Sequence, residues 1–333
     1  MSERVLVIKL SALGDFVQAT GPMKAIRAAH PDAHITLLTT KPYAAMAEAT
    51  GWFDAVWSDG RPDWTDLSAV WRLLSRLRGG RFDRVYDLQT QKRSIRYFQL
   101  LWPHRPLWSG NAPGAAFLYA GPERDRLHVQ DSHRNQLAIA GIETVGPPDV
   151  SWLTGDAAKF DLPRPYALLA PGGAPHRPAK RWPADRFGAL AASLLGQGVT
   201  PAVLGHGAEE QALADVILAA APGAVSLVGR TALGDIADLA RGAALAVGND
   251  TGPMHVVVAA GCPSVVLFSR DSDPALSAPR PIRDDQPVTI LREMDLGDLA
   301  VEPVLEAVEA VRGDFTPQAE ELSRPSRRPP EGR

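Results

Sequence analysis

The chain has 333 residues, more than one hydrophobic core usually supports, so two domains are expected. Hydrophobic residues make up 45% of the sequence and charged residues 22%, which is typical of a compact globular protein and excludes a largely disordered one. The net charge of −3 is close to neutral and argues against a protein that coats nucleic acid.

Cys262 is the only cysteine of the chain, so neither an internal disulfide nor a cysteine zinc site can form. This usage favours a reducing compartment, and we expect the protein to be cytoplasmic. The apolar run at residues 5–8 is too short for the core of a signal peptide or for a membrane span. Any contact with a membrane is therefore expected to be peripheral.

The first half of the chain alternates short apolar segments with helical patterns. Strands are expected over residues 5–10, 35–38, 54–57 and 84–88. Helices are expected from residue 16 to 26 and over residues 43–49, 67–77 and 94–101. Residues 103–165 are rich in Pro and Gly, with one helical segment near 130–140, and we place the domain boundary near the end of this stretch, at residue 160.

The alternation restarts in the second half. Strand-like segments lie at residues 166–170, 201–204, 225–228, 245–248 and 264–268, and helices are expected to start near residues 184, 209, 233 and 251. A closing helix is expected over residues 301–311, and the polar segment 314–333 is predicted to be a disordered tail. The pattern predicts an α/β fold with two parallel sheets, whose ligands bind at the carboxyl ends of the strands.

The strongest candidate site follows the predicted strand at residues 245–248, where residues 249–255 (NDTGPMH) lead directly into a helix. A helix N-terminus offers free backbone N–H groups and a positive dipole end, which suit a diphosphate, and Gly252 permits close approach. Thr251 adds a hydroxyl donor, and His255, one turn further on, faces the same side. The alternative is that Asp250 or Thr251 only caps the helix and that His255 packs locally.

A second candidate is the loop of residues 171–183, which leaves the first strand of the second domain and contains Lys180. A lysine in a loop rich in Gly and Pro can reach a phosphate leaving group as a mobile point charge. The alternative is an ordinary solvated basic loop, because Lys and Arg are mostly exposed.

Two further candidates lie in the first domain. Asp15 ends the loop after the first strand, where its carboxylate could take a proton from an acceptor hydroxyl, or could merely cap a helix that starts at Phe16. Lys92, Arg93 and Arg96 follow the fourth strand. They suit an acceptor that bears carboxylates or phosphates, or they form a solvated helix face.

Several well-known site patterns are absent from the sequence. The turn at Gly205 lacks G-x-G-x-x-G spacing, and no G-x-x-x-x-G-K-[ST] motif occurs. The histidines do not fall at zinc-ligand spacing, and no Asp-x-Asp stands at the end of a strand. We therefore expect neither a typical dinucleotide enzyme nor a P-loop NTPase, and we expect no metal ion.

Taken together, these segments resemble glycosyltransferase family 9, the lipopolysaccharide heptosyltransferase family. The matching pieces are residues 7–15 (VIKLSALGD), 87–89 with 92–94, 178–183 (PAKRWP), 205–209 and 248–255 (GNDTGPMH), in this order. The resemblance covers residues 5–312. It implies the GT-B arrangement, in which an acceptor-binding Rossmann-like domain (1–160) and a nucleotide-sugar-binding one (161–313) face each other across an interdomain cleft.

The resemblance also implies an activity. This is the inverting, metal-independent and cofactor-free transfer of a heptose from ADP-heptose to a sugar of the lipopolysaccharide core. Asp15 would be the general base, and Lys180 would stabilise the departing diphosphate. The implied donor-binding residues are Asn249, Asp250, Thr251, Gly252, His255 and Gly205. The implied acceptor-binding residues are Ser11, Gln89, Lys92, Arg93 and Arg96.

The implied partners are a nucleotide sugar and a lipid-linked glycan acceptor, with peripheral contact at the inner face of the cytoplasmic membrane. The sequence does not indicate an oligomeric state. Three alternatives stay open: a transferase of the same fold with another nucleotide sugar or acceptor, an epimerase-like relative that cleaves a nucleotide sugar, and a non-catalytic protein that binds nucleotide sugars or glycans.

Overall fold

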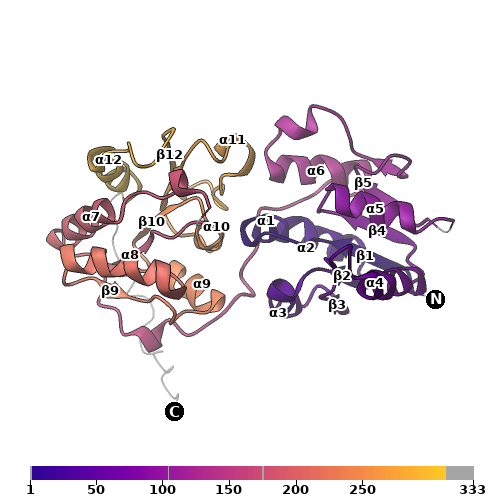
Figure 1. Ribbon diagram of the computed structural model, residues 1–333, viewed down its shortest axis with the longest axis horizontal. Helices are drawn as coiled ribbons and strands as arrows, with labels where there is room; N and C mark the ends of the chain where they lie inside the picture. The colour runs from indigo at the N-terminus through magenta and orange to yellow at the C-terminus, as the bar shows by residue number, and fades with distance from the viewer. Residues whose placement is uncertain (1, 104, 175, 313–333) are drawn as a thin grey trace, which may run out of the picture.

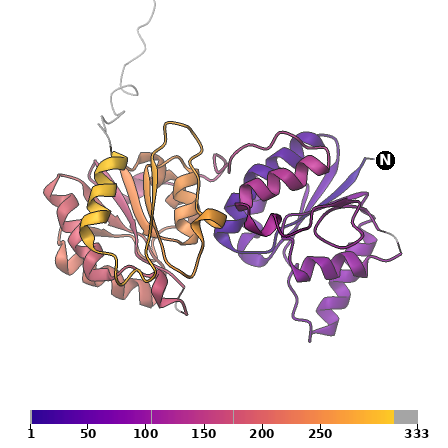
Figure 2. The ribbon, with the colours of Figure 1, turned by 90° about the horizontal axis from the view of Figure 1, so that it is seen from above.

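The computed structural model describes residues 2–103, 105–174 and 176–312. The tail predicted over residues 314–333 lies outside this described part. Two six-stranded parallel sheets, one from each half of the chain, lie side by side and meet through a narrow region (Figures 1 and 2). The predicted α/β architecture with two parallel sheets is confirmed, and the predicted domain boundary at residue 160 falls between the sheets.

The first sheet has the strand order β3-β2-β1-β4-β5-β6. Its strands are β1 (Arg4–Ile8), β2 (His34–Leu38), β3 (Ala55–Trp57), β4 (Arg84–Asp87), β5 (Leu107–Gly110) and β6 (Phe117–Leu118). The helices of this half are α1 (Leu13–Gln18), α2 (Thr20–Ala29), α3 (Lys41–Ala49), α4 (Leu67–Gly79), α5 (Lys92–Leu100) and α6 (Val129–Ile139). In the centre of this sheet, Val7 lies between Leu37 and Tyr86.

The second sheet has the order β12-β11-β10-β7-β8-β9. Its strands are β7 (Tyr166–Ala170), β8 (Thr200–Val203), β9 (Val225–Ser226), β10 (Leu245–Asn249), β11 (Ser264–Phe268) and β12 (Val288–Arg292). The helices are α7 (Ala184–Gly196), α8 (Gly207–Ala220), α9 (Leu233–Gly242), α10 (Gly252–Ala259), α11 (Pro274–Ser277) and α12 (Val301–Arg312). Counted along the chain, both sheets have the strand order of a Rossmann fold.

The strands β5, β6 and β12 were not predicted. β5 and β6 lie within the Pro- and Gly-rich stretch that suggested irregular structure, yet Trp108 of β5 is fully buried and completes the first sheet. β12 is an edge strand with no fully buried residue, so it lacks the continuous apolar pattern of a central strand. Weak burial at the sheet edge explains the omission of β6 and β12, whereas β5 was missed because it lies within the Pro- and Gly-rich stretch.

The first helix also differs from the prediction. It begins at Leu13 rather than at Phe16, and the chain divides at Ala19 into α1 and α2. Asp15 is therefore the third residue of the helix and not its N-cap.

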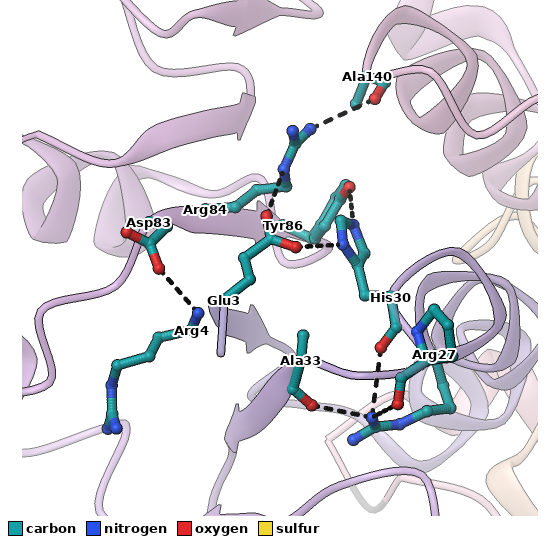
Figure 3. A network of polar contacts seen from close by, with 10 residues as sticks. Glu3, Arg4, Arg27, His30, Ala33, Asp83, Arg84, Tyr86 and Ala140 are labelled. Carbon is teal, nitrogen blue, oxygen red and sulfur yellow. Dashed lines mark hydrogen bonds and ion pairs between the residues drawn. The ribbon is translucent and has the colours of Figure 1, made fainter. Parts of the chain in front are cut away.

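A polar network lies at the amino ends of β1 and β4, away from the carboxyl ends where ligands bind (Figure 3). The His30 ring contacts the Glu3 carboxylate through Nδ1 and the Tyr86 hydroxyl through Nε2, each at 2.8 Å. Arg84 lies 3.4 Å from the same carboxylate. These contacts give His30 a structural role, because both ring nitrogens already have partners.

One cluster of buried apolar side chains runs through both halves of the chain. Phe16 and Val17 of α1 belong to it, as do Met254 and Val257 of α10. Polar contacts reinforce the junction. The Gln18 side chain donates to the Ser277 carbonyl at 2.9 Å, the His128 ring contacts the Ala278 carbonyl at 2.8 Å, and Arg280 pairs with Asp131 at 2.8 Å.

Cys262 lies between α10 and β11, and burial raises the pKa of its thiol to about 12. Among the helices of residues 2–312 that the structure describes, none is long and apolar enough to cross a membrane.

Candidate active site

Four loops meet the carboxyl ends of the central strands. In each sheet the direction of strand progression reverses between two neighbours, β1 and β4 in the first and β7 and β10 in the second. The loops after these four strands contain four of the predicted segments, at residues 9–15, 88–94, 171–183 and 250–252. Ligands of open α/β sheets bind at this switch point, because the two loops leave toward opposite faces and open a crevice.

The two halves touch where α1 and α10 begin. A Cβ atom added to Gly14 would come within 2.5 Å of Cδ2 of the His255 ring. A Cβ atom added to Gly252 would lie 2.8 Å from the Leu13 side chain. Since real Cβ atoms do not approach so closely, glycine at both positions lets the two helix N-termini meet. Asp15 thereby follows directly after the residue that contacts His255.

Asp15 itself is half-buried. Its carboxylate accepts a hydrogen bond from the Ala12 N–H at 3.3 Å, which partly caps α1 from inside the first turn. The carboxylate makes no ion pair with any residue in the described ranges. Capping and proton transfer are compatible here, because a second carboxylate oxygen stays available.

Lys180, Asp250 and His255, which we call the Asp250 group, belong to the second half and lie on the other side of the junction from Asp15. The Lys180 ammonium is 2.5 Å from the Asp250 carboxylate, and Nε2 of His255 is 3.8 Å from its other oxygen. All three side chains are nearly buried, with 12%, 9% and 8% exposure. Burial alone would raise the pKa of Asp250, but the neighbouring His255 and Lys180 outweigh it and hold this pKa well below its usual range.

This arrangement changes the interpretation of the Lys180 loop. Lys180 ends the short 3-10 helix η3 (Pro178–Lys180) and is ion-paired, so it is neither a mobile point charge nor part of a solvated basic loop. The sequence could not reveal the pairing, since 70 residues separate the two partners.

Asn249 supports the loops around the site. Its fully buried side chain donates to the Pro171 and Gly172 carbonyls at 2.8 and 3.1 Å and accepts from the Trp182 N–H at 3.1 Å. These bonds tie the loop after β7 to the end of β10. The side chain predicted to bind the donor therefore has its polar atoms committed to the protein.

Thr251 is the N-cap residue of α10, but its hydroxyl makes no capping bond. The Thr251 hydroxyl and Nδ1 of His255 are both buried without a hydrogen-bond partner among the described residues. Buried polar atoms are normally paired, so both atoms are suited to contact a ligand. The capping alternative for Thr251 is not realised.

The turn at Gly205 holds a carboxylate that sequence reasoning missed. The Glu210 carboxylate accepts from the His206 N–H at 2.7 Å, and a Cβ atom on Gly172 would come within 2.1 Å of it. Glu210 therefore lies between the loops after β7 and β8. A glutamate in the first turn of a helix after a Gly-x-Gly turn is the only signal that the sequence offered.

On the first half, two neighbouring cavities open beside Ser11. Their volumes are about 640 and about 510 Å³, and both are lined by Leu10, Ser11 and Arg61. Lys92 and Arg93 line the smaller cavity. Arg61, whose guanidinium lies 3.4 Å from the Ser11 hydroxyl, belongs to no recognisable motif and was not predicted.

The remaining acceptor candidates differ in position. The buried Gln89 side chain accepts from the Leu10 N–H at 2.7 Å and the Ser11 N–H at 3.3 Å, so it positions the loop that borders both cavities. Arg96 lines neither cavity; its guanidinium lies 5.2 Å from the Trp64 ring centroid. The structure thus brings Ser11, Lys92 and Arg93 together and places Arg96 apart from them.

A buried polar cluster supports the loop after β4. The Lys9 ammonium donates to the Leu88 carbonyl at 3.2 Å, and the His133 ring contacts the same carbonyl at 3.3 Å. Burial raises the pKa of Asp87 to about 6 and lowers the pKa of Lys9. Burial, with Lys9 nearby, lowers the pKa of His133 to about 3, so the ring is neutral at neutral pH.

No group of three or more His, Cys, Asp or Glu side chains within residues 2–312, as far as they are described, is placed to hold a metal ion. Three groups near the junction are suited to take part in catalysis: the Asp15 carboxylate, the Lys180 ammonium, and the N–H groups at the start of α10.

Two Rossmann-like halves, with switch-point loops that meet at one junction, define the GT-B fold. The family is given by sequence. The model of glycosyltransferase family 9 (heptosyltransferase) matches residues 70–296, and the chain belongs to this family.

Two relatives of this chain are also named heptosyltransferases. Lipooligosaccharide heptosyltransferase 2 of Haemophilus influenzae is 34% identical over 114 residues, a match that spans only 33% of this chain and 32% of that protein. Lipopolysaccharide heptosyltransferase 2 of Salmonella typhimurium is 27% identical over 304 residues, covering 82% of this chain and 86% of the relative.

Solved structures share the fold. A family 9 glycosyl transferase from Veillonella parvula aligns with a TM-score of 0.79 at 22% identity, over 94% of this chain and 98% of the other. ADP-heptose lipopolysaccharide heptosyltransferase II of E. coli aligns with a TM-score of 0.71 at 22% identity, over 93% of this chain and 98% of the other.

Proposed function

We propose that this glycosyltransferase moves a heptose from ADP-heptose to a sugar of the lipopolysaccharide core, with inversion at the anomeric carbon and without a metal ion. The contact of Gly14 with His255 carries the proposal, because it sets Asp15 of one half beside the Asp250 group of the other. The names of the Salmonella and E. coli proteins support the choice of donor and acceptor.

The second half supplies the donor side. A carboxylate repels a diphosphate but accepts hydrogen bonds from sugar hydroxyls, so we assign Asp250 to hydroxyl groups of the donor. The backbone N–H groups of Thr251 and Gly252, at the N-terminus of α10, suit the phosphates. Lys180 then neutralises negative charge that develops on the leaving diphosphate.

The reaction is a direct displacement. Asp15 accepts the proton of the acceptor hydroxyl, whose oxygen bonds to the anomeric carbon while the bond from this carbon to the diphosphate breaks. The electron pair leaves with ADP, whose charge Lys180 and the helix N–H groups stabilise. Attack from the side opposite the leaving group inverts the anomeric configuration.

The first half supplies the acceptor side. Arg61, Lys92 and Arg93 place three cationic side chains around the cavities beside Ser11. Cations suit a core acceptor that bears carboxylates or phosphates. Arg93 is also held by a hydrogen bond to the Pro62 carbonyl at 2.8 Å, so this part of the surface is ordered by the protein itself.

The test uses the purified protein, ADP-heptose and lipopolysaccharide from a strain that lacks core heptose. We expect ADP release, a mass gain of one heptose on the acceptor and an inverted anomeric configuration by NMR, all retained in EDTA. ADP-glucose, UDP-sugars and GDP-sugars serve as donor controls. Donor binding without turnover on any acceptor would instead indicate a binding protein, and loss of activity in EDTA would reject metal independence.

Lys180→Ala tests the leaving-group assignment. Removing a cation that acts on the leaving diphosphate is expected to lower turnover about a hundredfold or more, with little change in acceptor binding. Lys24→Ala is the matched control, because Lys24 also pairs with an aspartate, at 2.6 Å, but is 60% exposed and lines neither cavity beside Ser11. Equal activity of the two variants would refute the assignment.

A further inference from the structure

The helix α4 presents an apolar stripe to solvent. Leu67 and Trp71 are 76% and 70% exposed, and Trp102, just after α5, is 65% exposed; no other large apolar side chain in the described part exceeds these values. Leu67, Trp71 and Arg78 share one side of the helix by their spacing. The core side of α4 is separate and carries Leu73 and Leu77.

A basic cavity continues this stripe. Arg78 donates to the Leu100 carbonyl at 2.9 Å and so joins the end of α4 to the end of α5. Beside this bond lies a cavity of about 790 Å³, lined among others by Arg78, Arg81, Trp102 and Arg105. We call the stripe and cavity together the α4–Trp102 face: Leu67, Trp71, Arg78, Arg81, Trp102 and Arg105.

The charge around this face opposes that of the whole chain. Residues 61–106 contain ten Lys or Arg and four Asp, whereas the complete chain has a net charge of −3. Arg78, Arg81 and Arg105 form no ion pair with an acidic residue within the described ranges. Exposed aromatic rings amid unpaired guanidinium groups match a partner that is both apolar and anionic.

We propose that the α4–Trp102 face docks onto a bilayer that contains anionic phospholipids. Trp71, Trp102 and Leu67 enter the interface between headgroups and acyl chains, where tryptophan is favoured. Arg78, Arg81 and Arg105 pair with lipid phosphates. A single helix of this kind would bind weakly, but the rigid junction with α5 presents apolar and cationic groups at once.

The position of the face connects it with the site. Ala69 and Arg72, on another side of α4, line the larger cavity beside Ser11. One helix therefore borders both the docking face and the acceptor side. With the face docked, a lipid-linked acceptor could stay in the bilayer while its sugars reach Ser11. This link to the site rests on the proposed function, whereas the docking itself does not depend on it.

The experiment is sedimentation of the full-length protein with vesicles. We expect binding to phosphatidylglycerol–phosphatidylethanolamine vesicles, weakening as salt rises, and little binding to phosphatidylcholine vesicles. Arg81→Gln with Arg105→Gln should weaken binding about thirtyfold, from about 1 kcal/mol for each basic residue near an anionic surface. Trp71→Ala with Trp102→Ala should weaken it about tenfold or more.

The controls change the same residue types elsewhere. Arg270→Gln with Arg283→Gln neutralises two exposed arginines of the second half, at 53% and 54% exposure, and Met294→Ala removes an apolar side chain of 60% exposure. These variants should bind vesicles as the wild type does. The proposal would be overturned if the control variants lost as much vesicle binding as the face variants, or if the wild type showed no preference for anionic vesicles.

Two further readouts separate the remaining outcomes. Transfer to a delipidated acceptor should stay unchanged in the face variants, so loss of this activity would mean that the face belongs to the catalytic machinery. Light scattering of the wild type and Trp71→Ala tests a second copy of the chain as partner. A dimer that dissociates in the variant would assign the face to self-association and overturn the membrane proposal.

Discussion

Asp15 and Asp235 occupy the same position in two copies of one short sequence, Ala-Leu-Gly-Asp. In each copy the carboxylate accepts the N–H of the alanine, at 3.3 Å from Ala12 and 2.9 Å from Ala232. Asp235 additionally pairs with Lys159 at 2.7 Å and is buried, whereas Asp15 is half-buried beside the junction. The chain thus contains its own comparison between a structural aspartate and a proposed base.

The two aspartates should therefore respond differently to the same substitution. Asp15→Asn should keep the fold and lower turnover about 10²–10⁴-fold, because an amide cannot accept the acceptor proton. Asp235→Asn should do the reverse: it should lose about 1–2 kcal/mol of folding free energy and keep turnover. Denaturant titration and the ADP-release assay measure the two effects. If Asp15→Asn turned over as fast as Asp235→Asn, the role of Asp15 would be limited to capping the helix.

His133 makes stability depend on pH. Its pKa is about 3 in the folded protein and about 6.5 when unfolded. The unfolded chain therefore binds more protons between these values, so stability is complete above pH 6.5 and falls as the pH decreases toward 3. Going from pH 7 to pH 5 should cost the wild type about 2 kcal/mol relative to His133→Asn. If the free energy of unfolding changed with pH in the same way in both proteins, His133 would not be a buried neutral ring in the folded state.

At the residue scale, the sequence indicated which loops follow the central strands, but not what each side chain in them contacts. Asp15, Lys180 and Asp250 were singled out by their place after strands. The pairing of Lys180 with Asp250, and the commitment of Asn249 to backbone carbonyls, depend on contacts between distant segments. Such contacts leave no local pattern, which is also why Arg61 and Glu210 were missed.

At the element scale, burial determines how well the sequence predicts a strand. β7 and β10 are buried along their whole length and read as continuous apolar runs, so they were predicted almost to the residue. β6 has only two residues and β12 is half exposed, and neither was predicted. The start of α1 was misplaced because Leu13 and Gly14 form its first turn without a polar N-cap side chain.

The close approach of α1 to α10 depends on glycine at position 14. Gly14→Ala should push the two helix starts apart, since its Cβ would lie 2.5 Å from the His255 ring, and should lower turnover while the fold persists. Gly196→Ala, at a helix position with no atom within 4 Å of the new Cβ, is the control and should be neutral or stabilising by about 1 kcal/mol. Unchanged kinetics in Gly14→Ala would show that the close contact is dispensable.

At the scale of the whole molecule, the two halves share a core. The buried cluster that contains Phe16 and Met254 runs from the first sheet through the junction to the second. An interface of this kind resembles the interior of a domain more than a wet contact between independent domains. The length of a chain carries no information on which apolar faces meet, so this shared cluster could not be predicted from it.

Calorimetry tests whether the two halves unfold together. We expect one unfolding transition, with calorimetric and van't Hoff enthalpies in agreement, because neither half can lose the shared core alone. ADP at a hundred times its Kd should stabilise this single transition by about 2.7 kcal/mol. Two resolved transitions, of which ADP shifts only one, would instead indicate halves that unfold independently.

The lone thiol of Cys262 has a practical consequence for the study of motion between the halves. With its pKa raised to about 12 and its side chain buried, it is protonated and shielded at neutral pH, so it will not take up thiol-reactive dyes. The natural sequence is therefore already a clean background for site-specific labelling. One new surface cysteine in each half would report interdomain distances by fluorescence energy transfer, without a prior cysteine-removal variant.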